Sequence, residues 1–175
     1  MQHLVLVVGL IGPVAAGVVA FRAGGLYGVG APVPGEVVLA NPETQQIEQQ
    51  VSDSDENGRQ DTWLYWDDAR LQRREVDEDE NGLIDWWEYY DENETLVQVG
   101  FSTNDDGVRD ALSYLGPEGV IERIEYFRAD GTVRRTEFYE GNLIVRAEDD
   151  HDGDGEVDAR SLYRPNGDVE SIELD

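Results

Sequence analysis

Three stretches of the chain share a nine-residue pattern of oxygen-bearing side chains, Asp-x-Asp-x-Asn/Asp-Gly-x-x-Asp, over residues 53–61, 77–85 and 150–158. This spacing turns alternate side chains toward one point, and the Gly at the sixth place permits a sharp turn with positive φ. Hard cations bind carboxylate, amide and carbonyl oxygens, so the pattern predicts three sites for calcium (Ca2+). The expected side-chain ligands are Asp53, Asp55, Asn57 and Asp61; Asp77, Asp79, Asn81 and Asp85; and Asp150, Asp152, Asp154 and Asp158, with backbone carbonyls from Arg59, Leu83 and Glu156.

The alternative interpretation is that Asp, Asn and Gly merely form solvated turns in an acidic chain. The spacing favours metal sites, because the first two loops start about 24 residues apart and the third starts about three such periods later. Two stretches between them keep the frame with fewer ligands. Residues 102–110 have Ser in the first place, and residues 126–134 have Tyr126, Arg128 and Arg134 at ligand places. We expect weak binding in the former, and in the latter a loop that keeps its shape without metal.

Each loop is followed by residues rich in aromatic and β-branched types, which favour strands over helices. Two neighbouring positions, four and five places after each loop, are aromatic or aliphatic in every unit. Neighbours along a strand face opposite ways, so these positions predict one ladder on each face of a sheet. The first ladder comprises Tyr65, Tyr89, Tyr114, Phe138 and Leu162, and the second comprises Trp66, Tyr90, Leu115, Tyr139 and Tyr163.

A turn and a second short strand complete each unit as a β-hairpin of about 24 residues. Five hairpins in series predict a mainly β fold, an antiparallel meander of up to about ten strands with calcium loops between the hairpins. A loop that ends in Asp suits a connection between strands, whereas the helix-loop-helix calcium site usually has a bidentate Glu at the twelfth place. Only the second loop has that Glu, Glu88, which is either an extra ligand or a solvated strand residue.

These residues suggest two resemblances, which together cover about residues 52–175. The loops resemble the Asp-rich calcium loops of integrin α-subunit propellers, thrombospondin type 3 repeats and dockerins. The hairpins over residues 126–133, 139–143 and 163–169, with a Tyr, a turn Gly and then an aliphatic residue, look like the MORN-type repeats of bacterial proteins. The first resemblance implies calcium-dependent rigidity, and the second implies interaction or scaffolding.

The composition is extremely acidic, with 39 Asp and Glu against 13 Lys and Arg and a formal net charge of -26. This charge repels nucleic acid and anionic membrane surfaces. Bound divalent ions would relieve the repulsion where carboxylates are densest, so metal binding and folding should be coupled. All the basic residues are Arg, which fits either a GC-rich genome or adaptation to high salt.

Calcium loops of this kind suit the millimolar calcium found outside the cytoplasm. We therefore expect an extracytoplasmic protein, periplasmic or at the cell surface. The absence of Cys excludes disulfides and thiolate metal sites but leaves the redox compartment open.

Residues 4–21 are apolar and uncharged, which predicts a segment that enters a membrane. The segment is long enough for a short spanning helix, and a cleaved secretory signal is the alternative. The sequence thus predicts three parts: residues 1–21 as a transmembrane anchor or signal that contains one hydrophobic helix, residues 22–51 as a linker rich in Gly, Pro and Gln, and residues 52–175 as the repeat domain.

No catalytic constellation stands out. The sequence has no Cys that His3 or His151 could activate as a nucleophile, and the Gly-rich passage lacks the Lys of a phosphate-binding loop. The chain is therefore predicted not to be an enzyme. Because carboxylates are abundant, a glycosidase-type pair leaves a carbohydrate-active enzyme as a weaker alternative.

The predicted function is that of a membrane-tethered, extracytoplasmic calcium-binding β-repeat protein with a structural, adhesion or scaffolding role. The alternative is an accessory structural subunit of a larger membrane protein complex, anchored by the N-terminal helix. The expected partners are calcium ions, the membrane and a protein on the sheet surface or within that complex, and not nucleic acid. The aromatic ladders suit either cross-strand packing or a partner, which we would expect near Trp63, Trp66, Trp86 and Trp87.

Overall fold

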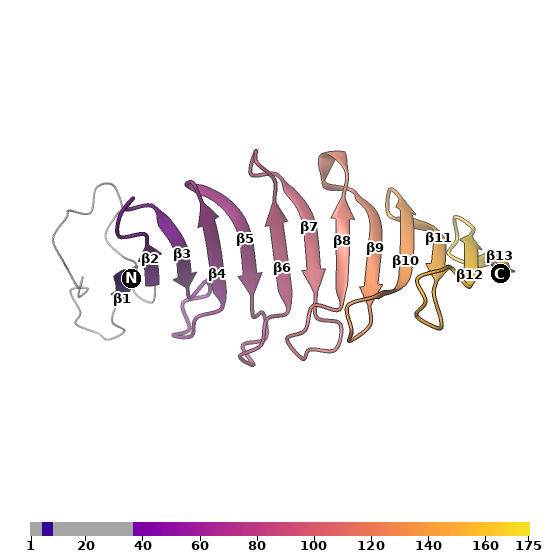
Figure 1. The fold of residues 1–175 in the computed structure, drawn as a ribbon, viewed down its shortest axis with the longest axis horizontal. Coiled ribbons are helices and arrows are strands. Elements are labelled where there is room, and N and C mark those ends of the chain that lie inside the picture. Colours follow the sequence, from indigo (N-terminus) through magenta and orange to yellow (C-terminus); the bar gives the residue numbers. More distant parts are fainter. Residues whose placement is uncertain (1–4, 9–36) are drawn as a thin grey trace.

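A computed structural model describes residues 5–8 and 37–175 as one antiparallel sheet of 13 strands, each paired with the next along the chain (Figure 1). The predicted mainly β, antiparallel fold is confirmed. One 3-10 turn, η1 (Pro117–Gly119), lies between two of the strands. The strands are β1 (Val5–Val8), β2 (Val37–Ala40), β3 (Ile47–Ser52), β4 (Thr62–Asp67), β5 (Arg70–Val76), β6 (Trp86–Tyr90), β7 (Leu96–Phe101), β8 (Ala111–Leu115), β9 (Ile121–Phe127), β10 (Val133–Glu140), β11 (Leu143–Asp149), β12 (Ala159–Tyr163) and β13 (Val169–Leu174).

The predicted repeat units correspond to five hairpins, β4–β5, β6–β7, β8–β9, β10–β11 and β12–β13. Their turns are short and built from residues that tolerate a left-handed backbone. One of the two-residue turns joins β4 to β5 through Asp68 and Ala69, whose φ angles of 48° and 61° suit the twist of such a hairpin turn. Local turn chemistry therefore fixes where each hairpin reverses.

The sheet begins earlier in the chain than the sequence predicts. β2 and β3 form a sixth hairpin, and β3 pairs with β4, so the linker interpretation is wrong for residues 37–51. The physical reason is that Val38 and Val51 are buried, at 8% and 7% exposure: Val38 lies in an apolar run, and Val51 alternates with the polar residues Gln50 and Ser52. The remaining linker residues, 22–36, lie outside the described residues.

The predicted N-terminal helix falls mostly outside the described residues. Its four described residues, Val5–Val8, form β1 beside β2, so the helix prediction is wrong for them. Three of the four are β-branched Val, which suits a strand better than a helix. Over residues 5–8 and 37–175, no helix has the length and apolar character needed to cross a membrane.

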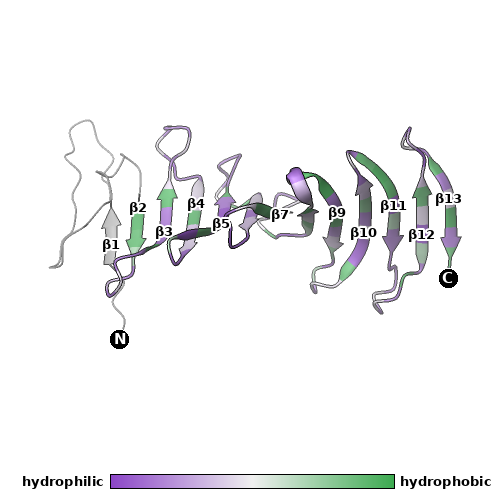
Figure 2. Cartoon of the chain, turned by 90° about the horizontal axis from the view of Figure 1, so that it is seen from above, coloured by the Kyte–Doolittle hydropathy of each residue, from purple (hydrophilic) through white to green (hydrophobic). Residues whose placement is uncertain are grey.

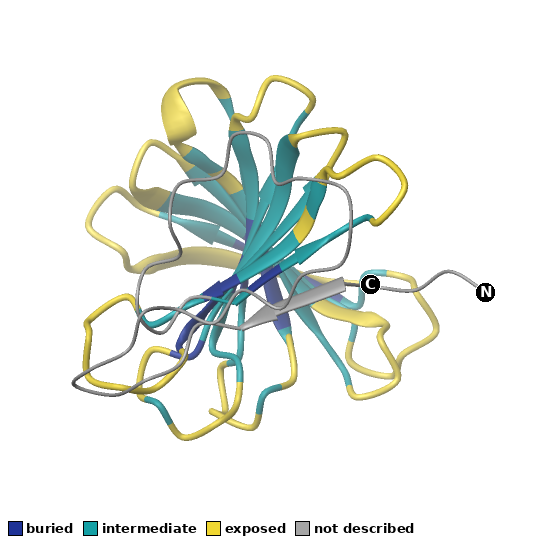
Figure 3. Ribbon diagram, turned by 90° about the vertical axis from the view of Figure 1, so that its left-hand side faces the viewer, coloured by how far each residue is buried: buried dark blue, intermediate teal, exposed yellow. Residues whose placement is uncertain are grey.

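The described chain is a single twisted layer, and most strand residues on both faces are only half-buried (Figure 3). Hydrophilic and hydrophobic residues both occur along most of the strands (Figure 2). Ladder hydrogen bonds and cross-strand side-chain pairs must therefore supply stability that a second layer normally adds. The buried apolar residues are Val38, Val51, Trp87, Val99, Ala111, Leu112, Ala147 and Ala159.

A β-bulge recurs at the same place in every hairpin. The register shifts between the two predicted ladder positions, as between Tyr65 and Trp66 in β4 and between Phe138 and Tyr139 in β10. A bulge bends its strand and increases the local right-handed twist. The repeated bulges account for the strong twist of the sheet when it is viewed along its long axis (Figure 3).

Candidate metal centres

The three Asp-rich stretches lie in a row along one rim of the sheet (Figure 1). They connect β3 to β4, β5 to β6 and β11 to β12. In a meander every second connection falls on the same rim, so a repeat of one hairpin per unit aligns the loops. We call this the loop rim, formed by residues 53–61, 77–85, 102–110, 128–132 and 150–158, and the opposite one, with the hairpin turns, the turn rim.

Within each Asp-rich loop the carboxylates of the first, third and ninth places converge. One ligand oxygen from each lies within 4.8 Å of the other two. Oxygens that share a calcium ion at 2.3–2.6 Å are at most about 5 Å apart, so each group matches the span of a calcium shell. The groups are Asp53, Asp55 and Asp61; Asp77, Asp79 and Asp85; and Asp150, Asp152 and Asp158.

Hydrogen bonds inside the loops hold these carboxylates in place. The first-place carboxylate accepts the N–H of the sixth-place Gly, at 2.6, 2.9 and 3.0 Å in the three loops. That Gly has φ of 97°, 91° and 90°, where a side chain would be strained. The ninth-place carboxylate accepts the N–H of the second residue, at 2.9, 2.7 and 2.5 Å. The same framework therefore recurs in all three loops.

The fifth and seventh places are linked differently. The side-chain oxygen of the fifth residue accepts the N–H of the seventh, at 2.9 Å for Asn57 and Arg59 and at 2.8 Å for Asn81 and Leu83. The last loop repeats this bond between Asp154 and Glu156, also at 2.8 Å, but Asp154 is not in the converging carboxylate group. The structure thus brings together nine of the predicted ligands and leaves the fifth-place side chains beside them.

Two carboxylate oxygens in these groups are buried without a hydrogen-bond donor. Asp61 and Asp77 are only 5% and 3% exposed, and Oδ1 of each has no hydrogen-bond partner. Burial raises the pKa of Asp61, but hydrogen bonds, including two from Ser54, outweigh burial and hold the pKa below its usual value. A buried, ionised oxygen without a partner is unfavourable unless a cation satisfies it.

Glu88, weighed as an extra ligand of the second loop, is instead paired within the sheet. It lies in β6 and accepts hydrogen bonds from the Tyr90 hydroxyl at 2.6 Å and from Trp86 Nε1 at 3.2 Å. Arg74 Nη1 lies 3.3 Å from Glu88 Oε1, and the Glu88 side chain is 14% exposed. Its partners therefore favour the strand interpretation, in a half-buried rather than solvated position.

The loop at 102–110 is satisfied by its own donors. Asp110 accepts the N–H and hydroxyl of Thr103 at 2.8 and 2.6 Å and the side-chain amide of Asn104 at 2.7 Å. Ser102 Oγ accepts the N–H of Asp106 at 3.1 Å. In the part of the chain that the structure describes, no converging carboxylate group forms in this loop.

The expected nine-residue loop at 126–134 is wrong. Tyr126 lies in β9 and Arg134 in β10, and the turn between the strands closes where Arg128 N–H donates to the Thr132 carbonyl at 2.8 Å. The Asp130 carboxylate accepts the Thr132 N–H at 3.0 Å. The segment is therefore a short turn of the kind found on the turn rim, with Tyr126 and Arg134 in the flanking strands.

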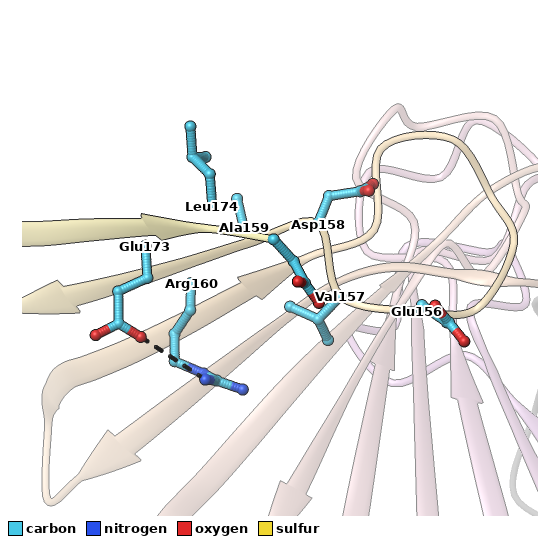
Figure 4. Close-up of a pocket in the computed structure, with 8 residues that line it drawn as sticks. Glu156, Val157, Asp158, Ala159, Arg160, Glu173 and Leu174 are labelled. Atoms are coloured by element: carbon cyan, nitrogen blue, oxygen red, sulfur yellow. Dashed lines mark ion pairs between the residues drawn. The ribbon is translucent and has the colours of Figure 1, made fainter.

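A shallow hollow lies beside the last loop, at the C-terminal end of the sheet (Figure 4). Glu156 and Asp158 of the loop contribute to its lining. Inside it, Arg160 Nη1 and Glu173 Oε2 form an ion pair at 3.9 Å. These two charges neutralise each other. Apart from the loop residues, the hollow therefore has no cluster of side chains suited to catalysis.

Comparison with known proteins gives no family. No family model and no curated protein matches the sequence. Solved structures with a partial likeness include TarM, with a TM-score of 0.44 and 10% identity over 54% of this chain and 18% of that chain. Another is the GtfA/B complex bound to UDP and GlcNAc, with a TM-score of 0.33 and 12% identity over 73% of this chain and 22% of that chain. The chain spans about a fifth of the length of these structures, and likenesses this weak indicate nothing about function.

Proposed function

We propose that the Asp-rich loops are calcium sites and that the protein is a non-enzymatic, calcium-stiffened β-repeat protein. The observation that carries this proposal is the pair of buried, unpartnered oxygens on Asp61 and Asp77, each within a group of converging carboxylates. A divalent cation supplies the missing partner and offsets the repulsion among three negative charges. The same loop framework in residues 150–158 extends the proposal to a third ion.

The donor set favours calcium over magnesium. Each loop supplies three converging carboxylates, and the sequence pattern adds a fifth-place side chain and a seventh-place carbonyl as expected ligands toward a shell of six to eight oxygens. Magnesium is smaller, prefers strict octahedral geometry and keeps several waters, so it rarely fills such an all-protein loop. Loops that join adjacent strands become rigid when filled, which stiffens the rim of a sheet that has no second layer.

A structural, scaffolding or adhesion role outside the cytoplasm follows from this design. The described sheet has two open faces and a row of loops suited to millimolar calcium. Among the Trp residues suggested as a docking site, Trp87 is only 9% exposed. The Trp86 ring packs edge-on against the Phe101 ring, with 4.8 Å between the ring centroids, so both Trp residues stabilise the sheet itself.

Calorimetric calcium titration of the full chain tests the proposal, with magnesium as the comparison ion. We expect three calcium ions per chain and much weaker magnesium binding. Asp77→Asn should remove one ion. The matched control is Asp110→Asn, which changes a carboxylate of the self-satisfied loop and should leave three. A titration without binding at millimolar calcium would refute the proposal.

A further inference from the structure

The loop at 102–110 reaches over the site of the loop before it. The Asn81 side-chain amide donates to Asp79 Oδ2 at 3.2 Å and also to Asp105 Oδ1 at 3.1 Å, so one amide bridges carboxylates from two loops. Backbone packing brings the loops together, because a Cβ built on Gly107 would lie 3.2 Å from Leu83 Cβ. Asp105, in the loop at 102–110, therefore faces the carboxylate group of the loop at 77–85.

The buried carboxylate of that group points to a cation independently of this bridge. Asp77 is 3% exposed, its Oδ1 lacks a hydrogen-bond partner, and its carboxylate converges with those of Asp79 and Asp85. Asp105 adds a fourth carboxylate to the three. The Asn81 amide lies between two of these carboxylates, those of Asp79 and Asp105.

The first site has a similar contact, but an arginine offsets it. The Asn57 amide donates to Asp55 Oδ2 at 2.9 Å and to Glu80 Oε1 of the next loop. Arg59 Nη1 lies 3.7 Å from the Glu80 carboxylate and also donates to the Glu80 carbonyl at 3.4 Å. The charge that the second loop brings to the first site is therefore partly compensated.

The last site also has a compensating arginine. Arg128 Nη2 lies 3.3 Å from Asp150 Oδ1 and donates to the Asp150 carbonyl. Among residues 37–175, by contrast, no ion pair with Arg or His involves any of the four carboxylates at the second site, those of Asp77, Asp79, Asp85 and Asp105. The second site thus has four carboxylates, as many as the first site with Glu80, but no positive side chain to offset them.

We propose that Asp105 is an additional ligand of the second calcium site, delivered by the neighbouring loop, and that this site binds most tightly and fills first. The inference rests on the proposed calcium function. Affinity in oxygen cages rises with the charge of the ligands and the rigidity of the site. An ion held by both loops would also tie the β5–β6 connection to the β7–β8 connection, which gives the loop at 102–110 a role although it lacks its own carboxylate group.

Calcium titrations of the full chain compare wild type with Asp105→Asn and with Glu56→Gln. Glu56 is the matched control, since it stands at the same fourth place of the first loop with a similar left-handed backbone, φ 63° against 57° for Asp105. We expect one tight and two weaker sites in wild type. Asp105→Asn should weaken only the tight site, by about 10- to 100-fold, and Glu56→Gln should change none.

A double variant assigns the effect to the second site. In an Asp77→Asn background the tight site is already lost, so adding Asp105→Asn should have no further effect on calcium affinity. If Asp105→Asn weakens binding no more than Glu56→Gln while Asp77→Asn still removes one ion, the calcium function stands and the role of Asp105 is refuted. If wild type binds no calcium, both proposals fail.

Discussion

The two rims of the sheet use the same residue types in different numbers. On the turn rim the acceptors are fewer and their donors are close, as where Asp91 Oδ1 accepts the N–H groups of Asn93 and Thr95 at 2.8 and 2.9 Å. On the loop rim three carboxylates converge, and backbone donors do not reach all of their oxygens, as Asp61 and Asp77 show. What distinguishes a candidate metal site from a solvated turn is therefore the surplus of oxygens over donors.

The strands between the rims pair their arginines with carboxylates. Arg73 pairs with Glu75 at 3.0 Å, and its guanidinium carbon lies 4.1 Å from the centre of the Tyr65 ring. Arg123 repeats this arrangement with Glu125 and the Tyr114 ring, at 3.0 and 3.5 Å. The planar guanidinium can pair with a carboxylate and stack on an aromatic ring at once, which an ammonium group cannot. Much of the uncompensated negative charge is left to the loop rim.

Calcium should therefore have the largest effect on stability. Each filled site adds about 2.7 kcal/mol when calcium is at 100 times its Kd. A chain of this size gains about 2–4 °C in Tm per kcal/mol, so three sites should raise Tm by about 15–30 °C relative to chelator. Thermal unfolding followed by circular dichroism in calcium, in chelator and in sodium chloride of matched ionic strength measures this.

The salt control separates ion binding from charge screening. Sodium chloride screens repulsion between exposed carboxylates but does not supply a doubly charged ligand for the buried oxygens. It should recover only a small part of the calcium effect. Equal stabilisation by sodium chloride and calcium would instead mean that the loop rim is a solvated acidic surface adapted to salt.

A smaller effect is expected from Arg135→Ala in the strands. Arg135 bonds to Glu137 at 2.9 Å, to both oxygens of Asp149 at 2.8 and 2.9 Å, and to the Tyr163 hydroxyl at 3.1 Å. Removing it leaves two half-buried carboxylates without their cation, a loss of about 1–3 kcal/mol in the free energy of unfolding. Urea unfolding in chelator measures the loss, and calcium affinity should not change.

Arg164→Ala is the control for that variant. Arg164 Nε lies 3.9 Å from Glu170 Oε1, and both side chains are more than half exposed, at 53% and 57%. The loss should be within about 0.5 kcal/mol. If the two variants were equally unstable in urea, the strand ion pairs would contribute no more than exposed ones.

Features encoded by short stretches of sequence were predictable. Aromatic and β-branched runs separated by turn residues predicted the mainly β meander, and the loop pattern predicted which carboxylates lie together. Both depend on neighbours within about ten residues. The turn at Asp68 and Ala69 follows the same logic, since it needs only two residues to take positive φ.

Features set by neighbouring strands and loops were not predictable from these patterns. Whether residues 37–51 form strands depends on β4, which supplies the pairing partner. The repeated bulges also arise between strands. Asp105 was missed because its contact with Asn81 crosses from one loop to the next, although its fourth-place position, matched by Glu80 in the second loop, was visible in the aligned repeats.

Tyr90→Phe should produce an effect of about 1 kcal/mol, since it removes one hydrogen bond within the strands. The Tyr90 hydroxyl donates to Glu88 Oε2 at 2.6 Å, and burial followed by this bond raises its pKa to about 12. A raised pKa favours the neutral phenol in the folded state, so the contribution is complete below pH 10 and is lost as the pH rises toward 12. Other tyrosines also have raised pKa values, so phenolate absorbance should show one fewer late-ionising group in the variant than in wild type.

The smallest effect is expected on the turn rim, from Asp91→Asn. Hydrogen bonds from the Thr95 and Asn93 N–H groups lower the pKa of Asp91, so the ionised form stabilises the turn. Asn keeps a neutral acceptor in that place, and the variant therefore loses only the contribution of the charge. Because the folded pKa is depressed, wild type should be the more stable protein above about pH 4 and should converge with the variant as the pH falls through that folded pKa. Urea unfolding between pH 7 and pH 2 measures this difference in stability. Above pH 4 the difference should be the same in calcium and in chelator, because the Asp91 carboxylate already accepts two hydrogen bonds and does not need a cation.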